Sequence, residues 1–194
     1  MLGCNVAQQS HTAAKARAAV DAAQRLRDVL RMCVVRAPAP LAVEPGHRSV
    51  FLAGAIAGPW RTLIAEALRD TRVTLWDPRR EDWDSTWDES ADDPRFRAQA
   101  EWELEAQERA DLIAMYLSPE SEAPISLLEF GLSAKSGKVI VCCPDGFWCK
   151  PAVDVVCRRY DLTVVSDLAA MIATIARGAG STGGTSSTVH TTSR

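Results

Sequence analysis

Glu129 has the most unusual surroundings of any ionisable residue in the sequence. It follows Leu127 and Leu128 and precedes Phe130, inside the otherwise apolar segment ISLLEFGLSAKSGK. Burying a carboxylate costs several kcal/mol unless other groups hold it, so such a residue is a candidate for chemistry. A structural alternative is a helix-face glutamate that pairs with Lys135 or another cation.

Other carboxylates lie upstream of Glu129. Glu101, Glu103 and Glu105 alternate along FRAQAEWELEAQERA, so they cannot all share one face of a helix, and at most one or two can point at a pocket. Asp111 follows this segment, where it could bind a ligand, cap an element or pair with an arginine. The three histidines lie outside the segment that we expect to fold: His11, His47 and His190. Any acid–base chemistry therefore falls to carboxylates.

A glycine loop, GAIAGPWR, follows the apolar segment SVFLAGA. Gly54 and Gly58 would let backbone amides approach a ligand, and the following helix N-terminus favours an anionic or electron-rich oxygen. The loop matches neither the GxGxxG dinucleotide pattern nor a P-loop. A tight turn from a strand into a helix explains it equally well.

Residues 48–177 alternate strand-like and helix-like segments. The predicted strands are 49–55, 71–78, 111–117, 139–143 and 162–165, and the predicted helices are 60–70, 96–110, 125–138, 151–160 and 167–177. Strands with few polar residues, separated by helices, indicate a parallel sheet covered on both faces. We therefore expect an α/β fold with a five-stranded, doubly wound sheet.

Ligands of such sheets bind beyond the carboxyl ends of the strands. The candidates for substrate binding are Gly54, Ala55, Gly58, Trp60, Arg61, Asp77, Asp111 and Ser126. Trp60, Trp76 and Phe147 could stack on a planar base or serve as ordinary hydrophobic cover.

Both ends of the chain differ from this middle part. Residues 12–33 predict an amphipathic helix, either an extra helix or part of a transit peptide, and a Pro-rich linker completes the N-terminal region 1–47. Residues 178–194 form a Gly/Ser/Thr tail that we expect to be disordered. The acidic segment 81–94 is either a mobile lid or a solvated loop, and its spacing matches no EF-hand.

The composition of the 194 residues is that of a soluble globular protein, with 47% hydrophobic and 24% charged residues. No apolar run reaches the length of a bilayer span. Residues 1–48 have a net charge of +4 and the remainder −7, which disfavours a nucleic acid polymer as partner. None of the six cysteines forms a CxxC pair, so we expect free thiols and a cytoplasmic protein.

Three stretches of the sequence together resemble the nucleoside 2-deoxyribosyltransferase-like family: FLAGAIAGPW, WELEAQERADLIAMYL and SLLEFGLSAKSGKVIVCCPDGFWCKP. The resemblance covers about residues 48–167 and implies a flavodoxin-like fold and a homo-oligomer. It implies that Glu129 attacks the anomeric carbon of a sugar, displaces the nucleobase and forms a glycosyl-enzyme ester. It also implies that Glu103 belongs to the acid–base and base-recognition set, and that the loop from Gly54 to Pro59 lines the pocket.

Cleavage of an N-glycosidic bond suits these residue types. An ionised carboxylate at the anomeric carbon stabilises or traps an oxocarbenium-like centre, and a second carboxyl group protonates the departing base. Neither role needs a metal or a cofactor, and the sequence indicates a site for neither. Ala123 stands where the family's transferases have an aspartate, and Ala57 where related nucleotide N-glycosidases have an arginine.

Three hypotheses follow. The first is an enzyme that cleaves an N-glycosidic bond of a nucleoside or nucleotide, or transfers its sugar. The second is a non-catalytic nucleotide-binding or sensing module on the same fold. The third is a scaffold domain whose N-terminal helix docks a partner. We further expect helix 96–110, with Trp102, to form an oligomer interface.

Overall fold

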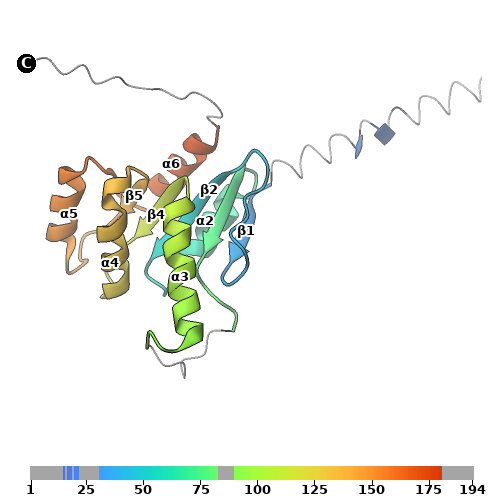
Figure 1. Cartoon of the computed structure of the whole chain (residues 1–194). Coiled ribbons are helices and arrows are strands. Elements are labelled where there is room, and N and C mark those ends of the chain that lie inside the picture. The colour runs from blue at the N-terminus through green and yellow to red at the C-terminus, as the bar shows by residue number, and fades with distance from the viewer. Residues whose placement is uncertain (1–14, 16, 19, 22–30, 83–89, 181–194) are drawn as a thin grey trace, which may run out of the picture.

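A six-stranded parallel sheet forms the centre of the computed structural model, which describes residues 15, 17, 18, 20, 21, 31–82 and 90–180 (Figure 1). The strand order is β1-β3-β2-β4-β5-β6. The bounds are β1 Cys33–Arg36, β2 Arg48–Gly54, β3 Val73–Asp77, β4 Leu112–Tyr116, β5 Val139–Cys142 and β6 Thr163–Val165. Among the described helices, none has the length and apolar character that crossing a membrane requires.

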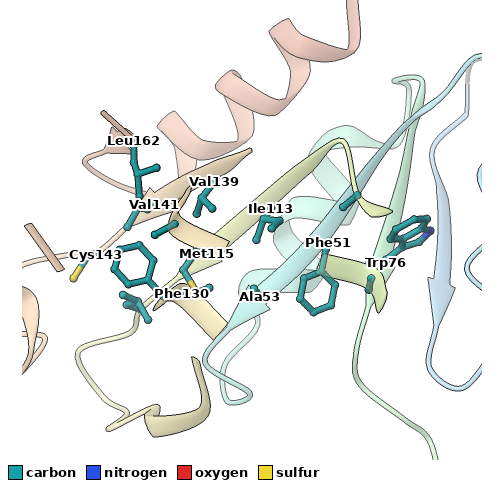
Figure 2. Packing of buried hydrophobic residues seen from close by; sticks show 14 of the residues in the cluster. Phe51, Ala53, Trp76, Ile113, Met115, Phe130, Val139, Val141, Cys143 and Leu162 are labelled. Carbon is teal, nitrogen blue, oxygen red and sulfur yellow. The ribbon is translucent and has the colours of Figure 1, made fainter. Parts of the chain in front are cut away.

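Helices cover both faces of the sheet. Their bounds are α2 Trp60–Leu68, α3 Pro94–Arg109, α4 Pro124–Ser133 with a following 3-10 turn at Ala134–Ser136, α5 Lys150–Arg159 and α6 Leu168–Gly180. Because successive strand side chains point to opposite faces, β2 supplies both layers of the core. Val50 and Leu52 pack with α2 and α6, whereas Phe51 and Ala53 pack with α3, α4 and α5 (Figures 1 and 2).

The prediction of five strands is wrong by one edge strand. β1 pairs in parallel with β3, with Val34 opposite Leu75 and Val35 opposite Trp76. The sequence predicts the end of a helix and the start of a linker here, because four residues are too few to show an alternating pattern. The other five strands have the 2-1-3-4-5 order of flavodoxin-like sheets.

The predicted flanking regions are only partly described. Residues 15, 17, 18, 20 and 21 are helical, and the rest of the predicted helix before residue 31 lies outside the described residues. Residues 83–89 of the acidic segment and residues 181–194 of the tail also lie outside them. α6 continues three residues beyond the predicted end at 177, and Arg48 Nη1 donates to the Gly178 carbonyl at 3.0 Å.

The chain reverses its direction across the sheet at β2, which lies between β3 and β4. Ligands of doubly wound sheets bind at the carboxyl ends of the strands at such a switch point. Gly54 ends β2 with a φ of +116°, and a Cβ there would collide with the carbonyl oxygen of Tyr116 at the end of β4. The Ala55 N–H donates to that same oxygen at 3.0 Å. Glycine is thus required where the first loop leaves the sheet.

Candidate active site

Helix α4 buries three polar side chains and leaves three large aliphatic side chains exposed. Its buried residues are Ser126, Glu129, Phe130 and Ser133, which lie on one face at helical spacing. Its exposed large apolar residues are Ile125, Leu128 and Leu132, each 60% exposed. Hydrophobic burial alone would favour the opposite orientation of this helix. The fold therefore buries Glu129 at the expense of apolar burial.

The Glu129 side chain is buried and has no ion-pair partner in the described part of the chain. The residue is 9% exposed, and Gln107 Nε2 donates to its Oε1 at 3.1 Å. Glu129 takes part in none of the ion pairs between described residues. Lys135 is exposed, and its Nζ lies 5.9 Å from the ring centre of Tyr160. The structural alternative of a Glu129–Lys135 pair is therefore wrong.

Helix α3 presents a stripe of three polar side chains, Gln99, Glu103 and Gln107, spaced four residues apart. Gln99 Nε2 donates to Glu103 Oε1 at 2.7 Å and to the carbonyl oxygen of Pro78 at 2.9 Å. Both glutamines are 6% exposed, and neither amide carbonyl has a hydrogen-bond partner among the described residues. Each amide nitrogen thus holds one carboxylate, while each amide oxygen is left unpaired.

Burial shifts the pKa of three ionisable groups in this region. Desolvation, reinforced by the negative charge of Glu103 and opposed by Arg61, raises the pKa of Glu129 to about 8. Desolvation also raises the pKa of Glu103, against the hydrogen bond from Gln99 and the charge of Arg61. Burial lowers the pKa of Arg61 to about 10. The structure therefore brings the two predicted catalytic carboxyl groups and Arg61 within electrostatic reach of one another.

Arg61 fastens the first loop rather than extending into solvent. Its guanidinium is buried and donates to the carbonyl oxygens of Leu52 at 3.2 and 3.3 Å, Gly54 at 3.0 Å and Ala55 at 2.6 Å. It also lies 3.6 Å from Asp77 Oδ1. These four bonds use most of the five guanidinium N–H groups to hold the backbone of the first loop. Substrate binding by Arg61 stays a prediction.

The three aromatic residues expected near a base are buried in the core. Trp60, Trp76 and Phe147 are all nearly inaccessible, which supports the hydrophobic-cover alternative for each of them. Trp148 is instead 63% exposed, and its Nε1 donates to the carbonyl oxygen of Glu122 at 2.9 Å. This bond links the loop after β5 to the loop before α4. Trp148 is an exposed aromatic residue at the carboxyl edge that is not among the aromatic candidates predicted from the sequence.

Two aspartates among the candidates are held by protein groups. Asp77 ends β3, and Arg79 binds its carboxylate with Nη2 at 2.7 Å from Oδ2 and Nε at 3.1 Å from Oδ1. Asp111 precedes β4 and so lies at the amino edge of the sheet. Its Oδ2 accepts from Ser49 N and Ser49 Oγ, both at 2.8 Å. The structure does not bring Asp111 to the carboxyl edge, where Glu129 and Glu103 lie.

The remaining candidates lie in the loop that enters α2 and at the start of α4. Gly58 has a φ of +88° in the exposed loop after β2. Ala123, at the N-cap of α4, has a left-handed φ of +43°, which is uncommon for a residue with a Cβ. Ser126 is buried one turn before Glu129 on the same helix face. Trp102, expected at an interface, is buried and packs edge-on against Phe51.

Comparisons with known proteins identify the family of the chain. No curated protein matches the chain. A conserved protein of known structure from Enterococcus faecalis V583 is similar at 15% sequence identity and a TM-score of 0.48, over 68% of this chain and 99% of that one. The family model described as nucleoside 2-deoxyribosyltransferase like matches residues 47–147, more than half of the chain. The matched range contains the first loop, Glu103 and Glu129, and the chain therefore belongs to the nucleoside 2-deoxyribosyltransferase-like family.

Proposed function

We propose that the protein cleaves the N-glycosidic bond of a nucleoside or nucleotide, or transfers its sugar, with Glu129 as the nucleophile. The main supporting observation is that α4 buries Glu129, which forms no ion pair with another described residue, while exposing three aliphatic side chains. Family membership supports a nucleoside-type ligand. Glu103, which raises the pKa of Glu129 by its charge, is the second carboxyl group of the mechanism.

The proposed attack requires an ionised Glu129, whereas Glu129 has a different protonation state in the free protein. With a pKa of about 8, Glu129 holds its proton at neutral pH in the free protein. We infer that Glu129 and Glu103 share one proton, and that this proton belongs to both carboxyl groups because their titrations are coupled. A positive charge developing at the anomeric carbon favours an ionised Glu129 and places the proton on Glu103.

The proposed reaction then proceeds in two displacements. A Glu129 oxygen forms a bond to the anomeric carbon as the bond from that carbon to the base nitrogen breaks. The departing base keeps the electron pair and takes the proton of Glu103. Water or a second base then attacks the anomeric carbon, gives a proton to Glu103 and releases the Glu129 carboxylate.

The loops supply the remaining contacts in this proposal. Gly54, Ala55 and Gly58 line the sugar and base, because their loop leaves the carboxyl end of β2. Ser126 lies next to Glu129 on the inner face of α4 and contacts the substrate there. No step of this proposal requires a metal or a cofactor.

Base release from a panel of nucleosides, deoxynucleosides and monophosphates tests this proposal, with and without an acceptor base. We expect wild type to release free base from at least one member, as followed by chromatography. Glu129→Gln should abolish release, whereas Glu101→Gln, on the exposed side of α3, should retain it. Full turnover by the Glu129 variant would refute the mechanism.

A binding module without turnover is the second candidate. The observation that favours it is Ala123, which stands at the N-cap of α4 where the family's transferases have an aspartate. Tight binding of a nucleoside without base release over long incubation would support this candidate and remove the enzymatic one.

A further inference from the structure

The carbonyl oxygen of the Gln107 side chain is buried and has no hydrogen-bond partner among the described residues. It belongs to the same amide group that donates a hydrogen bond to the proposed nucleophile, Glu129. The amide nitrogen donates to Glu129 Oε1 at 3.1 Å, so the carbonyl oxygen is the free end of the amide group. A buried acceptor without a hydrogen bond destabilises the folded protein, because it has lost the hydrogen bonds that water gives it in the unfolded chain. A ligand that donates a hydrogen bond beside Glu129 would satisfy this acceptor.

The geometry limits where that donor can lie. The nitrogen and oxygen of an amide are about 2.3 Å apart, so Gln107 Oε1 is at most about 5.4 Å from Glu129 Oε1. A reacting anomeric carbon lies about 3–3.5 Å from its nucleophile. The ring oxygen on that carbon cannot donate a hydrogen bond. The nearest donor that a pentose offers is then the hydroxyl on the neighbouring carbon, the 2′-hydroxyl.

We propose that Gln107 recognises the 2′-hydroxyl of a ribosyl substrate, with its amide nitrogen on Glu129 and its amide oxygen on that hydroxyl. This inference rests on the proposed function and narrows the substrate class from pentosyl to ribosyl compounds. A 2′-deoxyribosyl compound leaves the Gln107 carbonyl buried without a donor. A site built to bind a hydroxyl discriminates strongly against the analogue that lacks it.

Matched substrate pairs test the inference: adenosine with 2′-deoxyadenosine, cytidine with 2′-deoxycytidine, and their 5′-monophosphates. For each pair, equilibrium binding by calorimetry and base release by chromatography are measured on the full chain. Wild type should bind the ribosyl member of the preferred pair at least about tenfold more tightly. The ratio of the two affinities is measured on wild type alone, so this part of the test does not depend on whether any variant folds.

Two variants assign the preference to one side chain. Gln107→Met, of similar size and without the amide, should bring the two members within about threefold of each other. Gln99→Met is the matched control, because Gln99 holds Glu103 at 2.7 Å and its loss should leave the ribosyl preference unchanged. Thermal unfolding of both variants verifies that they fold.

The outcomes separate this inference from the proposed function. Base release with equal or tighter binding of the deoxyribosyl member, or a preference that survives Gln107→Met, would overturn the inference and leave the enzyme. A ribosyl preference that depends on Gln107 without any base release would support the inference and remove catalysis. Neither binding nor release across all pairs would remove both.

Discussion

Replacing Glu129 with glutamine should make the protein more stable, by an amount that grows with pH. The pKa of Glu129 is about 8 in the folded protein, against 4.5 for an ordinary glutamate. Between these values the folded protein binds one more proton than the unfolded chain, so the free energy of unfolding falls by about 1.4 kcal/mol per pH unit. The accumulated loss is about 3 kcal/mol at pH 7 and roughly 5 kcal/mol above pH 8.

Glu129→Gln removes this titration while retaining an oxygen that accepts from Gln107. The variant and wild type should therefore differ little in pH dependence below pH 4, where both states of wild type are protonated. Relative to that baseline, the variant should gain about 3 kcal/mol by pH 7. Urea unfolding followed by circular dichroism, repeated from pH 4 to pH 8, measures the difference.

The difference between the two proteins reports the titration of Glu129 together with that of Glu103, because the two carboxyl groups are electrostatically coupled. The carboxyl groups of Asp82, Asp93 and Asp167 have lowered pKa values, but they titrate alike in both proteins. Glu101→Gln on the exposed side of α3 is the matched control and should follow wild type at every pH. A Glu129→Gln advantage that stays constant from pH 4 to pH 7 would refute the claim that burial disfavours the charged side chain.

Three further predictions concern the acid, the first loop and the assembly. Glu103→Gln should abolish release of natural bases but retain cleavage of a glycoside whose leaving group needs no proton; equal loss of both would contradict an acid role. Gly54→Ala should cost about 3 kcal/mol or more in thermal unfolding because of its φ and the collision with β4, whereas Gly131→Ala, with open space and an ordinary φ, should not destabilise the protein. We propose a homo-oligomer that covers the exposed aliphatic face of α4; Leu128→Glu should then lower the mass measured by light scattering, and an unchanged oligomer would place the interface elsewhere.

Much of the sheet could be predicted from the sequence because its strands are short apolar runs between amphipathic helices. The buried strands β2, β3, β4 and β5 show this pattern clearly. β1 does not, because an edge strand of four residues has too few positions for a period and gains its order only by pairing with β3. Pairing partners of this kind are tertiary information.

Some residues of the candidate site could likewise be predicted from the sequence, whereas the roles of others depend on the folded structure. Glu129 stood out because a carboxylate in an apolar helix is costly, and that argument needs no coordinates. Arg61 did not reveal its role, since only the folded loop shows that the backbone carbonyls turn inward to meet its guanidinium. Gln99 and Gln107 were missed because glutamine is ordinary in a helix. Their four-residue spacing on either side of Glu103 was the available signal.

The nucleophilic role of Glu129 is tested most directly by quenching the protein with acid during turnover. The mass of the intact protein is then measured, and peptide mapping locates any added group. If Glu129 is the nucleophile, the peptide that contains it should gain the mass of one pentosyl group, and Glu129→Gln should form no such adduct. Steady base release by wild type without any adduct, together with continued release by Glu129→Gln, would contradict this role.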